Sequence, residues 1–185
     1  KPHSIVLSTH QPELITSYKI SDFQKKIISY KNLLIGPGMS NDAWSKKIFT
    51  KIKKYLSSQP TKINCVIDGG FLSMLSKDPY KYDDWIMTPH IGEAAQLLKK
   101  KSSDIEADRS KAAKELQEKY GGIIILKGPK TIIQTKENSY ICNHGNQGMG
   151  TAGMGDCLAG TVLSLITLAN TGDRIPSVLF ATGIH

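Results

Sequence analysis

The chain has 185 residues, of which 39% are hydrophobic and 22% charged, a composition typical of a globular protein with a sizeable core. Apolar runs all fall short of the roughly 20 residues that a membrane-spanning helix needs, so we expect no membrane partner. The net charge of +8 comes from scattered lysines without interleaved aromatic residues. We therefore expect no nucleic-acid partner, and we ascribe the charge to steering of anionic ligands.

The N-terminal part shows a short strand pattern at 5–7 and no features of a signal peptide. A capping-box pattern at 21–24 opens a predicted helix with Phe23 and Ile27 on its buried face. Because the sequence does not begin with Met and opens almost directly on a strand, we expect it to be a fragment of a longer chain.

Further along, short apolar segments have the length and composition of buried strands: 33–35, 65–67, 85–87 and 123–126. Residues 131–135 and 139–142 flank a polar turn and form a hairpin pattern. Because helix patterns separate the buried strands, we predict an α/β fold with a mostly parallel sheet that is covered on both faces.

Helix signals lie between these strands. The first helix is capped within 41–42, and its apolar positions follow the helical period: Trp44, Ile48, Ile52 and Leu56. For the second, Thr88 is the expected cap and Pro89 the first helical residue. A third is predicted over about 104–120, ending at Gly121.

The most informative stretch is the glycine-rich run 145–155, which leads into an apolar helix pattern at 157–166. Glycines let backbone N–H groups approach a ligand, and the helix start favours a phosphate. Asp156 lies in the first turn, where a carboxylate is repelled by phosphate unless it takes a proton from an attacking hydroxyl. The pattern thus predicts phosphoryl transfer with Asp156 as the base. The alternative is a plain loop with Asp156 as a helix stabiliser.

Ligands of open α/β sheets bind outside the carboxyl ends of the strands. Gly38 follows strand 33–35 in a Gly-Pro-Gly turn, which on its own is best explained as an ordinary connection. Asp68 follows strand 65–67. It either holds a metal or a substrate hydroxyl, or it caps the next helix, and the sequence leaves these alternatives open.

Two further strands are followed by candidate ligand-binding residues. His90 is expected in a first helical turn, where the helix dipole favours a neutral imidazole that can hydrogen-bond a substrate. Glu93 either orients a hydrated Mg²⁺ or only stabilises that turn. The segment Lys127-Gly128-Pro129-Lys130-Thr131 suits the phosphates or ribose of a nucleotide, unless Lys127 is a surface residue before a tight turn.

The order of these motifs resembles the ADP/ATP-dependent NAD(P)H-hydrate dehydratases of the ribokinase-like superfamily. The resemblance spans 33–163, and its specific elements are Thr-Pro-His-x-Gly-Glu, beginning at Thr88, and Gly-Asn-x-Gly-Met-x-Thr-x-Gly-x-Gly-Asp, ending at Asp156. It implies a ribokinase-like three-layer α/β/α fold with a mostly parallel central sheet. We expect a single domain over 1–185 that is truncated at both ends and lacks the family's N-terminal segment.

The family dehydrates NADH or NADPH hydrate with consumption of ADP or ATP, by phosphorylation of the ring hydroxyl and loss of phosphate. The resemblance implies that Gly38, His90 and Asp156 contact this substrate, with Asp156 also acting as base. It implies an adenine-nucleotide site made of Lys127, Gly128, Pro129, Lys130, Thr131, Gly153 and Gly155. Mg²⁺ is the implied cofactor, and we place Glu93 near it through water.

The resemblance also implies a homo-oligomer and an epimerase domain fused before this one in the full chain. The three cysteines, Cys65, Cys142 and Cys157, lack metal-ligand spacing. Their apolar neighbourhoods predict buried free thiols in a reducing cytoplasm, which is the localisation that we expect.

Some residues depart from the family pattern. Asp68-Gly69-Gly70 lacks the second carboxylate that is usual after this strand, so a role of this turn in metal or substrate binding stays open. Gln147 and Ala152 replace a frequent Pro and a frequent Gly, which are small changes in a site made largely of backbone.

Two other functions are weighed. A hydroxymethylpyrimidine or hydroxyethylthiazole kinase would share the glycine-rich loop, but these relatives commonly carry Thr-Pro-Asn where this chain has His90, and Cys near the position of Asp156. A non-catalytic nucleotide-binding domain is the second alternative, and the retention of Asp156 in an intact loop argues against it.

Overall fold

The computed structural model describes residues 27, 30–58, 63–145, 151–169 and 172–185. The strand expected at 5–7 and the capping box at 21–24 lie outside these residues. Most of the glycine-rich run, at 146–150, also lies outside them.

One six-stranded sheet organises the described chain, with its strands side by side in sequence order. The strands are β1 (Asn32–Ile35), β2 (Asn64–Ile67), β3 (Trp85–Met87), β4 (Ile123–Leu126), β5 (Thr131–Gln134) and β6 (Ser139–Cys142). The first four run parallel, and β5 and β6 form the predicted antiparallel hairpin. The α/β fold with a mostly parallel sheet is thus confirmed.

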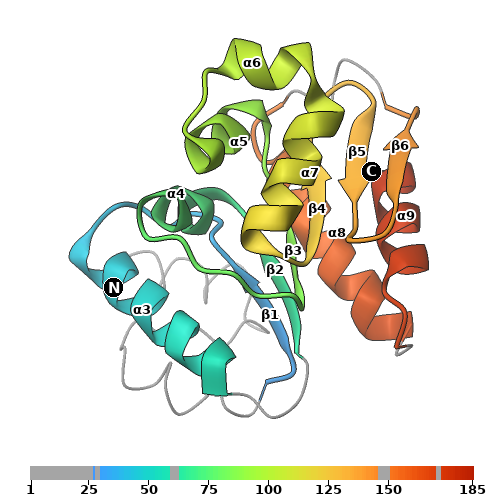
Figure 1. Ribbon diagram of the computed structural model, residues 1–185. Coiled ribbons are helices and arrows are strands. Elements are labelled where there is room, and N and C mark those ends of the chain that lie inside the picture. The colour runs from blue at the N-terminus through green and yellow to red at the C-terminus, as the bar shows by residue number, and fades with distance from the viewer. Residues whose placement is uncertain (1–26, 28–29, 59–62, 146–150, 170–171) are drawn as a thin grey trace.

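Helices cover both faces of this sheet (Figure 1). One face carries α3 (Ala43–Ser58), α4 (Gly69–Lys77), α5 (Ile91–Leu98), α6 (Ser102–Ala107) and α7 (Arg109–Tyr120). The opposite face carries α8 (Met154–Ala169) and α9 (Ile175–Ile184). The result is the expected three-layer α/β/α arrangement.

The buried strands are apolar throughout because both of their faces are covered. In β2, Cys65 and Ile67 belong to the core beneath α3 to α7, whereas Val66 between them belongs to the core beneath α8 and α9. The same alternation holds in β4, where Ile124 and Leu126 face the first core and Ile125 the second. Two layers of side chains therefore fix the sheet between the helices.

Three expectations need correction. The helix predicted over 104–120 is two helices, because Asp108 has φ −146° and its carboxylate accepts the backbone N–H of Lys111, which starts α7 anew. Trp44 is 45% exposed rather than buried. Cys157 is exposed and Cys142 only half-buried, so Cys65 alone fits the expected buried thiol.

Across the part of the chain that the structure describes, no helix has both the length and the apolar character needed to cross a bilayer.

Candidate functional site

The carboxyl ends of the parallel strands bring the predicted site residues to one edge of the sheet. Beyond the strands the backbones stay paired: Asp68 N donates to Ile35 O at 3.0 Å, and Lys127 N donates to Pro89 O at 2.9 Å. Together with the bond from Thr88 N to Ile67 O at 3.2 Å, these bonds place the segments that follow β2, β3 and β4 side by side, although they are far apart in the sequence.

The turns after β1 and β2 lie backbone against backbone. Gly36 has φ +118°, and a Cβ added to it would lie 1.6 Å from Asp68 O. Its carbonyl accepts the N–H of Gly70 at 3.1 Å, and a Cβ on Gly70 would lie 2.0 Å from Met39 O. Only glycine fits at these two positions, so the turns fix where Asp68 sits.

Gly38 lies in the same turn as Gly36, but its constraint is conformational. Its φ is +70°, and the space around its position is open. Glycine is favoured here by the left-handed backbone, and the exposed turn leaves the position accessible to a ligand.

His90 caps helix α5, which corrects the expected start at Thr88 and Pro89. Its Nδ1 accepts the backbone N–H groups of Gly92 at 3.0 Å and of Glu93 at 3.3 Å. The Glu93 carboxylate in turn accepts the N–H of His90 at 2.8 Å, which completes a capping box. Because Nδ1 is an acceptor, Nε2 carries the hydrogen of the neutral ring, and this side chain is 59% exposed.

A charge cluster, made of Asp68, Glu93 and Lys127, lies behind this cap. The Lys127 ammonium is 3.0 Å from Asp68 Oδ1 and 3.9 Å from Glu93 Oε2. The Asp68 side chain is only 3% exposed and that of Lys127 18%. Burial raises the pKa of Glu93 above its ordinary value, against the opposing effects of the His90 N–H and the Lys127 charge.

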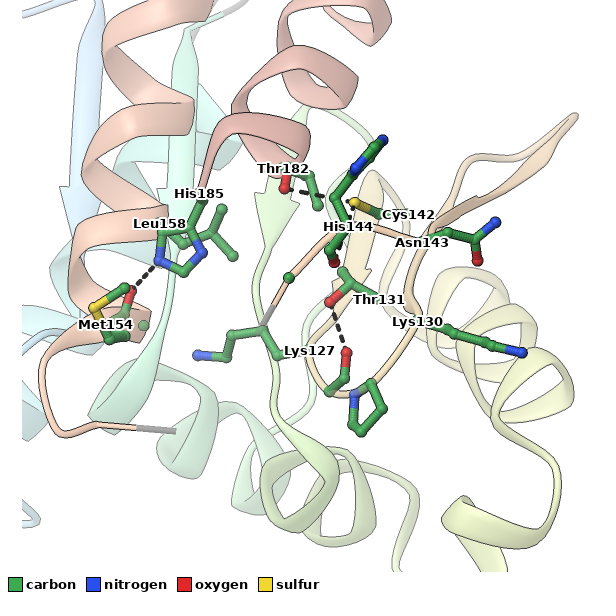
Figure 2. Close-up of a pocket in the computed structure, with 14 residues that line it drawn as sticks. Lys127, Lys130, Thr131, Cys142, Asn143, His144, Met154, Leu158, Thr182 and His185 are labelled. Atoms are coloured by element: carbon green, nitrogen blue, oxygen red, sulfur yellow. Dashed lines mark hydrogen bonds between the residues drawn. The ribbon is translucent and has the colours of Figure 1, made fainter. Parts of the chain in front are cut away.

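A pocket of about 550 Å³ opens between the 127–131 loop and the start of α8 (Figure 2). Its lining comprises Lys127, Gly128, Pro129, Lys130, Thr131, Cys142, Asn143, His144, Gly145, Met154, Gly155, Leu158, Thr182 and His185. Figure 2 shows the Lys127 side chain extending from the loop toward the first turn of α8. The pocket therefore combines a cation, backbone groups and the amino end of a helix, which together suit a phosphate.

The walls of the pocket are braced by hydrogen bonds. Thr131 Oγ1 donates to Gly128 O at 3.0 Å within the loop, and the Arg109 guanidinium donates to the carbonyls of Pro129 and Leu126 from outside. Across the pocket, His185 Nε2 donates to Met154 O at 2.7 Å and ties the end of α9 to the start of α8. The cavity is thus held open by fixed backbone on both sides.

The structure brings together six of the seven residues predicted for the nucleotide: Lys127, Gly128, Pro129, Lys130, Thr131 and Gly155. Gly153 precedes α8 with φ +89° and does not line the pocket. Asp156 is exposed in the first turn of α8, as predicted, next to the lining residue Gly155. Gly38 and His90 lie outside the pocket.

Sequence reasoning missed the far wall of the pocket. Asn143 and His144 could have been found from the hairpin, since its register pairs Thr131 with Cys142 and brings the residues after β6 beside the loop. Thr182 comes from α9 and His185 follows the last residue of that helix; the sequence carries no signal that places this helix at the pocket.

Comparisons with known proteins identify the family of this chain. A profile of the NAD(P)H-hydrate dehydratase family matches residues 2–185. A bifunctional NAD(P)H-hydrate repair enzyme from Coxiella burnetii is 34% identical over 95% of this chain, which spans 37% of that protein. An ADP-dependent (S)-NAD(P)H-hydrate dehydratase from Listeria monocytogenes is 29% identical over 97% of this chain, which spans 62% of it.

Solved structures share the fold. A ribokinase-like superfamily protein from Enterococcus faecalis superposes with a TM-score of 0.81 at 25% identity, over 97% of this chain and 62% of its own. The ADP/ATP-dependent NAD(P)H-hydrate dehydratase of Bacillus subtilis, crystallised with ATP and Mg²⁺, superposes with a TM-score of 0.68 at 24% identity, over 83% of this chain and 54% of its own. With its ribokinase-like fold and a family match over nearly its whole length, the chain belongs to the NAD(P)H-hydrate dehydratase family.

Proposed function

We propose that this chain is the catalytic domain of a lyase that returns hydrated NADH or NADPH to NAD(P)H at the expense of ADP or ATP. The observation that carries the proposal is the pocket at the amino end of α8, with the Lys127 ammonium beside Gly155. A transferable phosphate needs positioning and charge neutralisation more than covalent help, and this arrangement offers both.

In this proposal the nucleotide lies in the pocket. The 127–131 loop contacts its phosphates and ribose through Lys127, Lys130 and Thr131, with Gly128 and Pro129 shaping the loop. Gly153 and Gly155 bring the backbone at the start of α8 toward the terminal phosphate. The relatives named ADP-dependent and ADP/ATP-dependent support an adenine nucleotide as the co-substrate.

The hydrated dinucleotide binds on the other side of the first turn of α8. There Asp156 faces solvent, and His90 offers an exposed Nε2–H donor. The open, left-handed turn at Gly38 forms the remaining contact. All three groups follow the carboxyl ends of parallel strands or the amino end of α8, where substrates of such sheets bind.

The proposed reaction has two steps. First, Asp156 takes the proton of the ring hydroxyl while the hydroxyl oxygen bonds to the terminal phosphorus of ADP. The bond between that phosphorus and the bridging oxygen breaks at the same time, and AMP is released. Second, the carbon–oxygen bond breaks, inorganic phosphate leaves with the electron pair, and the neighbouring ring carbon loses a proton. The elements of water leave as one phosphate oxygen and two protons.

Mg²⁺ fits this site only as an ion that the nucleotide brings. The described residues include no group of three or more His, Cys, Asp or Glu side chains placed to hold a metal. Mg²⁺ retains several waters and is commonly held by phosphates with one or two carboxylates, so Glu93 would contact it through water. When bound, the ion neutralises phosphate charge.

The test is to incubate the full-length protein with NADH hydrate and either ADP or ATP, and to follow the return of NADH absorbance. AMP, phosphate and NADH should appear in equal amounts with ADP. No recovery with either nucleotide would overturn the proposal, whereas a stable phosphorylated product without phosphate release would favour a small-molecule kinase.

The bifunctional relatives support a further part of the proposal, namely that an epimerase domain precedes this domain in the full-length protein. We also propose a homo-oligomer in the cytoplasm, where the NAD(P)H pool is repaired. Epimerase activity and the mass by light scattering of the full-length protein test these two points.

A further inference from the structure

Asp68 has a buried carboxylate that the proposed reaction does not yet use. The residue is 2% exposed and occupies the cap position of α4, with extended backbone at φ −144° and ψ 175°. Its side chain nevertheless makes no capping hydrogen bond to the helix. Burying a carboxylate without a partner costs free energy of folding, so the group that pairs with Asp68 indicates the role of this residue.

That partner is Lys127, whose ammonium lies 3.0 Å from Asp68 Oδ1. Glu93 Oε2 lies on the same ammonium at 3.9 Å, beyond hydrogen-bond distance. An ammonium has three donors, so the bond to Asp68 leaves two for other acceptors. Asp68 therefore sets the direction in which the remaining N–H groups point.

The Lys127 ammonium lies against the start of α8. A Cβ added to Gly155 would lie 2.9 Å from Lys127 Nζ and 3.6 Å from Asp68 Oδ2, so both groups press against this turn. Lys127 lines the pocket, but Asp68 does not. The carboxylate thus lies beside the cation and close to Gly155, outside the lining of the pocket.

We propose that Asp68 is a positioning residue, which holds the Lys127 ammonium at the inner end of the pocket, aimed at the phosphate that the nucleotide transfers. This inference rests on the proposed function, since it assumes a nucleotide in the pocket. Of the roles that the sequence leaves open, Asp68 does not cap α4 through its side chain, and its burial keeps it from a substrate hydroxyl.

Neutralisation by Asp68 also explains how a cation can rest beside the positive end of a helix. The Lys127 ammonium and the N–H groups of the first turn of α8 repel one another in the absence of an anion. The Asp68 carboxylate compensates both charges. When a phosphate enters, it meets a preorganised donor set that needs little rearrangement.

A double-mutant cycle in the full-length protein tests this role. The variants are Asp68→Asn, Lys127→Met and both together, and the readout is ADP affinity by calorimetry. In the wild-type background, Asp68→Asn should weaken ADP binding by about tenfold to a hundredfold, the range for a lost hydrogen bond to a charged group. In the Lys127→Met background, Asp68→Asn should change ADP affinity by less than about twofold, because the effects of substitutions at residues in contact are not additive.

Asp42→Asn is the matched control, because it removes a carboxylate from the start of another helix, where Asp42 Oδ1 accepts the N–H of Ser45 at 2.7 Å. Asparagine also caps helices well, so ADP affinity should stay unchanged. Thermal unfolding checks that each variant folds, and Asp68→Ser replaces Asp68→Asn if the latter does not.

An equal loss of affinity in both backgrounds would overturn the inference, because Asp68 would then act on the structure and not through Lys127. Unchanged affinity of Asp68→Asn in the wild-type background would also overturn it. The proposed function is refuted by a different result. If the variants bind ADP as expected but the wild-type protein restores no NADH, the dehydratase activity alone is refuted. Wild-type protein that binds neither ADP nor ATP would refute both.

Discussion

Replacing Gly155 by alanine separates the stability of the fold from the function of the pocket. Gly155 lies in the first turn of α8, and the added Cβ would meet Lys127 Nζ at 2.9 Å. An ordinary contact is about 3.5 Å, so the ammonium would retreat by roughly 0.6 Å. The atom that moves is the end of a flexible side chain, so the fold should tolerate the change.

The expected effect on binding follows from that displacement. A retreating ammonium loses hydrogen-bond geometry to both Asp68 and a phosphate in the pocket. A charged hydrogen bond contributes about 1.5–3 kcal/mol, and we expect about half of that to be lost, which corresponds to a loss of roughly fourfold to tenfold in ADP affinity. The free energy of unfolding should change little, because the gain of up to about 1 kcal/mol for alanine over glycine in a helix offsets the weakened contact between Lys127 and Asp68.

Gly160→Ala provides the control within the same helix. No heavy atom lies within 4 Å of the Cβ that it would add. It should therefore raise the free energy of unfolding by up to about 1 kcal/mol without changing ADP affinity. Calorimetry and urea unfolding measure both quantities. ADP affinity of Gly155→Ala equal to that of the wild type would refute the placement of Lys127 at the phosphate.

Three other outcomes are expected. Asp156→Ala should lower turnover by about 100- to 10,000-fold, as for a lost general base, with ADP affinity within about tenfold of wild type; retained turnover would refute the base assignment. Burial raises the pKa of Glu93, so its contribution to stability is present below the unfolded pKa of about 4.3 and is lost as pH rises through the higher folded pKa. The free energy of unfolding of Glu93→Gln, measured with urea, should therefore rise relative to that of the wild type as the pH increases from about 4 to 7. A difference between the two proteins that stays constant with pH would contradict this reasoning. Iodoacetamide at about pH 8 should modify exposed Cys157 in the native protein but not Cys65, because burial raises the Cys65 pKa to about 12; equal labelling by mass spectrometry would show that the β2 core opens readily.

The sheet could be predicted from the sequence because its strands carry an unmistakable signal. Segments such as Ile123-Ile124-Ile125-Leu126 are apolar on both faces, which occurs where helices cover both sides of a sheet. Turn residues were equally informative, and Gly121 ends α7 with φ +77° as expected.

The errors arose where local pattern and tertiary context disagree. The break at Asp108 was missed because the Lys- and Glu-rich composition around it is helix-favouring, whereas an Asp carboxylate can equally start a new helix. His90 was assigned to the first turn because Thr88-Pro89 is a familiar helix start. Imidazole Nδ1 performs the capping instead, a role that residue type alone does not indicate.

The candidate site was predictable where it follows strand ends and not where it depends on long-range packing. Lys127 was placed at the sheet edge by the end of β4. Its partnership with Asp68, 59 residues earlier, depends on the parallel pairing of the three strands β2, β3 and β4 and could not be predicted from either motif. The contribution of α9 to the pocket has the same origin.

The close contact between Gly36 and the Asp68 carbonyl has a consequence for how this scaffold can diversify. Peptide groups, not side chains, set the distance between the turn at Gly36 and the turn at Asp68. A gradual change of side-chain size therefore cannot adjust the position of either turn. Variation that alters ligand preference would have to accumulate in the outer loops, such as the segment after β6. In this chain, Gly36 should therefore tolerate substitution less well than residues of those outer loops.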